Sequence, residues 1–178
     1  VNEAFNEGGG EVWVADGLYV DSSTYTVVLM KENVMMYGGF SGTEKTKAAR
    51  DWNTYASIID AQNTRRGVTG SNNATIDGFT ITNGRAAGTH GYETSPESSG
   101  SMGFGAGMLL DAVNTTVANC LFTANLAIGG NGATNSVGSA GYMGGDGSGG
   151  AIYINNASPT IVGCSFINNQ SIGGMGGN

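Results

Sequence analysis

The fold is decided by one stretch of sequence, Gly149-Gly-Ala-Ile-Tyr-Ile-Asn-Asn-Ala-Ser-Pro-Thr-Ile-Val-Gly-Cys-Ser-Phe-Ile-Asn-Asn-Gln-Ser-Ile172. Residues 105–128 repeat this stretch at a constant offset of 44 residues. A looser copy lies 41 residues further upstream, where Ile76 matches Val117 and Ile81 matches Phe122. A fixed period of this size, with apolar residues at fixed places, is typical of stacked-repeat proteins.

Residues two apart, such as Cys120 and Phe122, share one face of a strand. The repeats therefore predict short strands separated by corners, each paired in parallel with its counterpart one repeat later, which makes an all-β parallel β-helix. The side chains expected to stack in ladders are Met108 on Ile152, Val117 on Ile161, Cys120 on Cys164, Phe122 on Phe166 and Asn125 on Asn169.

Asn125 and Asn169 are predicted to occupy a tight corner, because asparagine tolerates the left-handed backbone conformation. Gly84 takes this place in the looser copy, and glycine tolerates the same conformation. Each amide is expected to bond to the copy above. The glycine-rich segments leave from one corner, so they are predicted to be long loops on one side of the molecule.

The repeats also divide the chain, which we expect to be a single domain over 1–178 and a fragment of a longer chain, since both ends look cut. The predicted parts are an N-terminal helical cap at 1–10, first coils at 11–84 with an excursion at 43–56, a loop at 85–104, a coil at 105–128, a Gly-rich loop at 129–148, a coil at 149–172 and the start of another loop at 173–178.

Composition restricts the partners. The net charge of −7 argues against nucleic acid, which needs a basic face. All seven basic residues lie between Lys31 and Arg85. No apolar run approaches the roughly 20 residues that cross a bilayer, so we expect no membrane insertion by this segment.

Four local features have two interpretations each. Cys120 and Cys164 are either a disulfide or a pair of stacked buried thiols. Asp146 is either a calcium ligand or part of a plain flexible loop, and no other cofactor is expected. Arg50 beside Asp51 and Trp52 forms either a site or, as we favour, local ion pairs that hold the excursion in place. His90 is either a catalytic histidine or, as we expect, a solvated one.

Several segments resemble a known group of proteins. They are Glu11-Val-Trp-Val-Ala-Asp-Gly-Leu-Tyr19, Tyr37-Gly-Gly-Phe-Ser-Gly-Thr-Glu44, Arg50-Asp-Trp52, Ile58-Ile-Asp60, Asp77-Gly-Phe-Thr-Ile-Thr-Asn-Gly84 and Asn119-Cys-Leu-Phe-Thr-Ala-Asn125. The chain is similar to right-handed parallel β-helix proteins of microbial surfaces, including the chlamydial polymorphic outer membrane proteins and related secreted bacterial proteins. This resemblance implies a right-handed coil, secretion, and an extracellular or cell-surface role that is more often adhesive than catalytic.

The alternative function is a carbohydrate-active enzyme, either a polysaccharide lyase or a glycosidase. A glycosidase needs carboxylates about 5–9 Å apart, but Asp77 aligns with Ala118 and Asp111 aligns with Asn155, so these two do not pair. The columns at Thr80 and Thr82 are too irregular for ice binding. We therefore expect a non-enzymatic structural or adhesive module, whose partners are other copies of itself, neighbouring repeats and surface glycans, with stacking of open coils into fibres as one mode of assembly.

Overall fold

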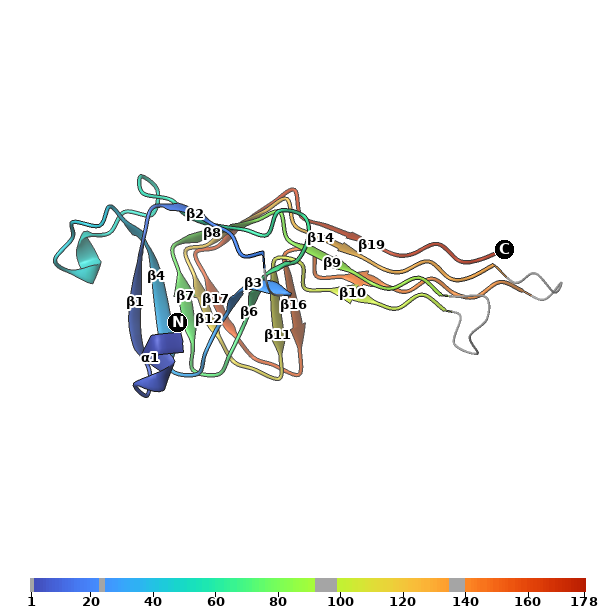
Figure 1. Cartoon of the computed structure of the whole chain (residues 1–178), viewed down its shortest axis with the longest axis horizontal. Coiled ribbons are helices and arrows are strands. Elements are labelled where there is room, and N and C mark those ends of the chain that lie inside the picture. The colour runs from blue at the N-terminus through green and yellow to red at the C-terminus, as the bar shows by residue number, and fades with distance from the viewer. Residues whose placement is uncertain (1, 23–24, 92–98, 135–139) are drawn as a thin grey trace.

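The computed structural model describes residues 2–22, 25–91, 99–134 and 140–178. It is an all-β chain of short parallel strands with a body and a long projection, which we call the arm (Figure 1). The arm comprises the described parts of 85–104, 126–148 and 170–178. Of the predicted loops at 85–104 and 129–148, residues 92–98 and 135–139 lie outside the described residues.

The body contains three parallel sheets, which together form a stack consistent with a β-helix or solenoid. The first sheet contains β1 (Gly10–Ala15), β4 (Val34–Phe40), β7 (Thr75–Asp77), β12 (Thr116–Ala118) and β17 (Thr160–Val162). The second contains β2 (Gly17–Tyr19), β5 (Ser57–Asp60), β8 (Phe79–Thr82), β13 (Leu121–Thr123) and β18 (Ser165–Ile167). The third contains β3 (Thr26–Leu29), β6 (Arg66–Thr69), β11 (Met108–Asp111) and β16 (Ile152–Asn155).

The strands stack in the register that the repeats predict. Met108 pairs with Ile152, and Val117 pairs with Ile161. The rings of Phe122 and Phe166 stack with their centroids 5.4 Å apart and their planes 13° apart. Each inner strand therefore satisfies its backbone groups on the strands before and after it in the stack.

The core lies inside these layers. The side chains of Leu110, Val117 and Phe122 are 0% exposed, whereas Phe166, one layer later, is 50% exposed. Burial of one such side chain contributes about 1.5–3 kcal/mol. The buried members of the ladders thus stabilise the body.

The helical segment at the N-terminus is short. Helix α1 (Asn2–Asn6) is followed by Gly8, whose φ of 92° is left-handed, and Gly9 N–H donates to the Ala4 carbonyl at 2.9 Å. This is a glycine-terminated helix end. Ala4 packs against the core of the body. Val1, which the sequence places in this helix, lies outside the described residues.

The corner prediction for Asn125 and Asn169 is wrong in its backbone conformation. The left-handed residue lies one position earlier, at Asn83, Ala124 and Asn168, with φ of 54°, 55° and 54°. Asn125 itself is fully buried and acts through its side chain. Position 84 requires glycine for a steric reason and not for the predicted backbone conformation. A Cβ there would lie 2.6 Å from the Asn125 Oδ1 atom.

The excursion at 43–56 contains a short 3-10 helix, η1 (Lys47–Ala49), and is held to the body by Arg50. Arg50 pairs with Asp77 at 2.6 Å, not with its neighbour Asp51, and lies over the rings of Tyr37 and Trp52. The ion pair is 10% and 13% exposed on its two sides. The interpretation as an anchor fits this geometry, but the partner is 27 residues away in the chain instead of local.

Replacing Arg50 with alanine is expected to lower the free energy of unfolding by roughly 3–5 kcal/mol, because Asp77 is left as a partly buried charge without its cation. Arg50→Lys is the control that keeps the charge and loses the planar contacts. Urea denaturation followed by circular dichroism measures both variants. A loss below about 1 kcal/mol for the alanine variant would show that the pair is screened like a surface salt bridge.

The Glu44 carboxylate closes the turn that begins the excursion. It accepts hydrogen bonds from the backbone N–H groups of Ser41, Gly42 and Thr43 at 2.8–3.1 Å. These bonds, that of Ser41 first, lower the pKa of Glu44 to about 2 from 4.5. The turn is therefore stabilised above pH 4.5 and loses this stabilisation as the pH falls towards 2.

An NMR titration of the Glu44 carboxyl carbon is expected to have its midpoint near pH 2. In Glu44→Gln, the amide shifts of residues 41–43 should lose their pH dependence over this range. A midpoint near the ordinary glutamate value would contradict the turn geometry.

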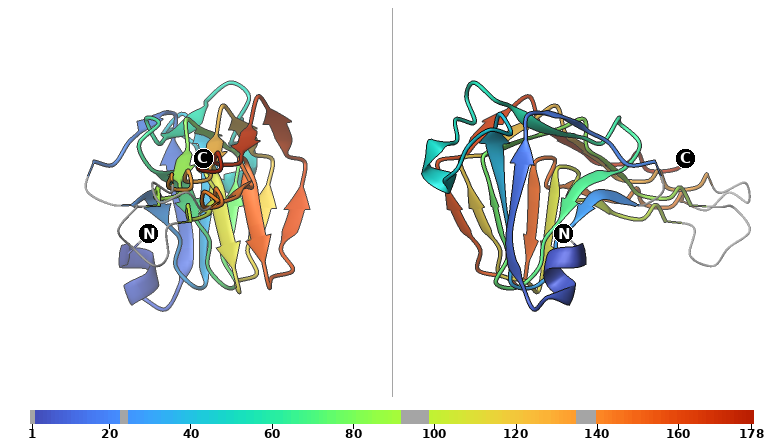
Figure 2. Two further views of the ribbon diagram at one scale, coloured as in Figure 1. Left: turned by 90° about the vertical axis from the view of Figure 1, so that its right-hand side faces the viewer. Right: turned by 60° about the vertical axis from the view of Figure 1, so that its left-hand side comes forward.

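Most of the arm is built from segments predicted to be long loops, together with the ends of the predicted coils 105–128 and 149–172, and backbone hydrogen bonds order its described parts. Its strands are β9 (Arg85–Ala87), β14 (Leu126–Ile128) and β19 (Gln170–Ile172), with β10 (Gly103–Phe104) and β15 (Gly147–Ser148). Figure 2 shows the described segments running out side by side beyond these strands.

Backbone hydrogen bonds in the arm repeat every three residues. The N–H groups of Gly129 and Gly132 donate to residues 172 and 175 of one neighbouring segment. Gly130, between them, donates to Ser101 on another segment. This period equals the three residues per turn of a polyproline II helix. The described segments of the arm are a bundle of chains with this period.

This bundle requires glycine where two chains approach. A Cβ on Gly130 would lie 1.8 Å from the Thr89 carbonyl oxygen, and a Cβ on Gly145 would lie 2.0 Å from that of Ser101. The high glycine content of these segments is thus a packing requirement.

Candidate functional site

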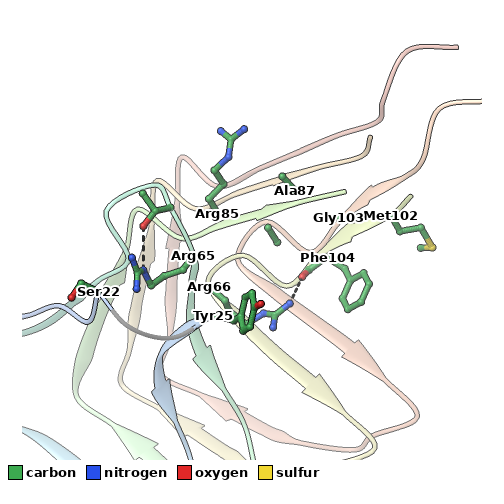
Figure 3. Close-up of a pocket in the computed structure, with 11 residues that line it drawn as sticks. Ser22, Tyr25, Arg65, Arg66, Arg85, Ala87, Met102, Gly103 and Phe104 are labelled. Atoms are coloured by element: carbon green, nitrogen blue, oxygen red, sulfur yellow. Dashed lines mark hydrogen bonds between the residues drawn. The ribbon is translucent and has the colours of Figure 1, made fainter. Parts of the chain in front are cut away.

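The site that we consider first is an open groove of about 610 Å³ where the arm joins the body. The groove is lined by side chains of three kinds, namely arginines, apolar or aromatic residues and small polar residues (Figure 3). These residues are Ser22, Tyr25, Thr64, Arg65, Arg66, Arg85, Ala86, Ala87, Met102, Gly103 and Phe104.

The first residues of two strands bring the arginines to this groove. Arg66 begins β6, and Arg85 begins β9. The Arg85 N–H donates to the Arg65 carbonyl at 2.7 Å, which joins the two segments. Three of the seven basic residues of this acidic chain therefore line one groove, and among the described residues no acidic side chain lines it with them.

Arg66 is the most fixed of the three. Its Nε donates to the Gly105 carbonyl at 2.7 Å and its Nη2 donates to the Phe104 carbonyl at 2.9 Å. Burial lowers the pKa of Arg66. A guanidinium remains charged in proteins even so, and three of its five N–H donors are not used by these two bonds.

Arg85 differs, since its side chain is exposed. Figure 3 shows its guanidinium directed away from those of Arg65 and Arg66. Arg65 donates to Thr64 at 3.1 Å. The sequence pattern does not single out this groove, and the adjacent pair Arg65-Arg66 at the start of β6 is the signal that could have indicated it.

Aromatic and apolar side chains form the other walls. The Phe104 ring lies 6.0 Å from Arg66 Cζ and packs against Tyr153 at 5.1 Å. Tyr25 is 95% exposed, and Met102 is 47% exposed. The groove thus combines positive charge with exposed apolar faces.

The predicted ladder residues lie in the body, away from this groove. The Asn125 Nδ2 atom donates to Asn169 Oδ1 at 2.8 Å. Cys120 and Cys164 are free thiols. The Cys120 Sγ donates to the Ala118 carbonyl at 3.1 Å, and the Cys164 Sγ donates to the Val162 carbonyl at 3.5 Å. Interaction with Cys164 and burial raise the pKa of Cys120, and interaction with Cys120 lowers the pKa of Cys164.

The acidic residues weighed for catalysis have partners. Asp77 binds Arg50 and also accepts from Asn119 Nδ2 at 2.9 Å. Asp111 accepts from Asn155 at 2.8 Å. The two carboxylates lie on different sheets, Asp77 on β7 and Asp111 on β11.

The metal and histidine candidates lie in the arm. Among the described residues, no three or more His, Cys, Asp or Glu side chains are grouped as a metal site. Asp146 contributes its carbonyl to the Gly103 N–H, and His90 Nδ1 accepts from Asn131 N–H at 2.9 Å. Calcium binding at Asp146 stays a prediction.

One regular column was not predicted from the sequence. Thr75, Thr116 and Thr160 are successive register partners in the first sheet. Their neighbours on the same face of these strands are Asp77, Ala118 and Val162, so no second threonine column lies beside the first on these strands. The columns at Thr80 and Thr82 are as irregular as expected, with Leu121 and Ile167 among their members.

None of the described helices has the length and apolar character needed to span a membrane. Comparison of the chain with protein-family models, with curated proteins and with solved structures gives no match.

Proposed function

We propose that the chain is a non-enzymatic structural and adhesive module of a cell surface or the extracellular space. In this proposal the body is a right-handed parallel β-helix, α1 caps its first layer, and the arm presents a contact surface away from the body. The resemblance to microbial surface proteins supports the location, and the packing of Ala4 against the core supports the cap.

One observation carries the proposal, namely that the arm is ordered by backbone bonds. A projection held by a three-residue pattern of hydrogen bonds keeps its shape without a core of its own. Preorganised surfaces lose less conformational entropy when they bind. A stiff projection with a groove at its base therefore suits contact with a partner more than it suits turnover of a substrate.

An array of neutral and acidic oligosaccharides tests the adhesive role. We expect the protein to be retained on a subset of the saccharides without cleaving them. Product formation with turnover on any polysaccharide would favour the alternative, a lyase or glycosidase. Absence of retention on every saccharide would overturn glycan adhesion.

A second role, stacking of copies into fibres, is favoured by the last layer of the body. Ile154 and Phe166 are 45% and 50% exposed, whereas their register partners Leu110 and Phe122 are 0% exposed. A further strand layer, from another copy or from neighbouring repeats, would cover these side chains and pair with the strand edges of this layer.

Analytical ultracentrifugation over a range of concentrations tests the stacking. We expect the protein to form oligomers. Phe166→Glu should dissociate them, because its charge would be buried in the contact between copies. A monomer at high concentration would contradict this role and would leave the adhesive role standing.

A further inference from the structure

We infer that the groove of Arg65, Arg66 and Arg85 binds the carboxylate of an acidic oligosaccharide. This inference rests on the proposed adhesive function and names the class of its ligand. It follows from three properties of the groove, which are its charge, the geometry of its donors and the character of its walls.

The charge comes first. Arg66 and Arg85 form no ion pair with any described residue, whereas Arg50 and Lys47 elsewhere in the chain each have an acidic partner. The nearest acidic residue in sequence, Asp21, precedes Ser22 and lines neighbouring grooves. Two guanidinium groups, those of Arg66 and Arg85, thus have no acidic partner among the described residues of a chain of net charge −7, which favours binding of an anion.

The donors suit an oxyanion. Arg66 is oriented by its bonds to two carbonyls, so its remaining N–H groups are preorganised at little entropic cost. Arg85 is exposed on a flexible stem and is able to close over a ligand. A guanidinium fork matches a carboxylate with two parallel hydrogen bonds.

The walls distinguish a saccharide from a small anion. A groove of about 610 Å³ is much larger than an inorganic phosphate needs and lies within the usual range for organic ligands. The exposed faces of Tyr25, Met102 and Phe104 offer apolar contacts for the C–H faces of sugar rings. A nucleic acid is disfavoured, since the repulsion from an acidic chain grows with the number of phosphates.

Isothermal titration calorimetry with a hyaluronan oligosaccharide, and with its methyl ester as the neutral twin, tests the inference. We expect the ester to bind roughly 10- to 100-fold more weakly, as is typical for loss of hydrogen bonds to a charged group. Arg85→Gln should weaken binding of the acid form by a similar factor and leave binding of the ester unchanged. Lys45→Gln, which removes one positive charge outside the groove, should change affinity less than about twofold.

Because the Arg85 side chain is exposed, we expect Arg85→Gln to fold like the parent protein. Circular dichroism checks this. Equal binding of acid and ester, or an unchanged affinity in Arg85→Gln, would overturn the inference while glycan adhesion stands. If inorganic phosphate or a single-stranded oligothymidylate binds more tightly than the hyaluronan oligosaccharide, the inference is overturned in favour of a phosphate ligand. If no saccharide on the array binds, the proposed function and the inference both fail.

Discussion

Replacing Asn125 with alanine is expected to lower the free energy of unfolding of the body by about 3–5 kcal/mol. The amide oxygen of Asn125 accepts from the Gly84 N–H at 2.8 Å. Its Nδ2 donates to the Ile81 carbonyl at 3.0 Å and to Asn169 Oδ1 at 2.8 Å. Alanine removes the partner of the Gly84 N–H and of the Ile81 carbonyl in a place that water does not reach, because Asn125 is 0% exposed.

Asn169→Ala is the matched control. Asn169 occupies the same ladder position one layer later, where it is only partly buried and donates to the Phe122 carbonyl at 2.9 Å. Water can reach this layer, so we expect a loss about half as large or less. Urea denaturation gives both values. Equal losses in the two variants would show that burial of the amide does not determine its contribution.

Replacing Gly130 with alanine is expected to open the arm while the body stays folded. The added Cβ would lie 1.8 Å from the Thr89 carbonyl oxygen, so the two segments must separate. Gly130 also donates to Ser101 and accepts from the Gly145 N–H, and the Gly174 N–H in turn donates to Gly145. These bonds form one chain across the arm, so their loss should be cooperative.

Hydrogen exchange of the arm amides measures this effect. Protection of Gly130, Gly145 and Gly174 should fall by roughly 100-fold, as expected when a local unit opens. Gly173→Ala is the control, because its Cβ would meet nothing closer than a carbonyl oxygen at 3.9 Å. Unchanged protection in Gly130→Ala, or an equal loss in Gly173→Ala, would show that the segments are not packed as a bundle.

The stacking register could be predicted from the sequence because parallel strands place equivalent residues directly over one another. A spacing of 44 residues between Phe122 and Phe166 therefore implies contact. The left-handed corner was predicted one residue too late. In the second repeat the corner position holds Ala124, a residue type that disfavours the left-handed conformation, so residue preference pointed to Asn125 instead.

The arm and the groove could not be predicted in the same way. Strand and helix periods are visible in a sequence through their side chains, but the three-residue period of the arm lies in backbone groups of glycine. The ion pair of Arg50 with Asp77 and the grouping of Arg66 with Arg85 depend on which coils become neighbours in space. The three-dimensional structure shows which coils are neighbours, whereas the local sequence pattern around each arginine does not.

The period of the arm also governs how its length is able to change. Residues 87 and 103 are separated by 16 positions and their partners 128 and 147 by 19, so the second excursion is longer by three residues, the number in one turn of a polyproline II helix. Within the described, hydrogen-bonded part of the arm, an insertion of one or two residues would rotate side chains into positions that only glycine fits. Insertion of three residues, or of a multiple of three, keeps each amide directed to the same neighbouring segment. The length of the projection is therefore expected to change in steps of three residues.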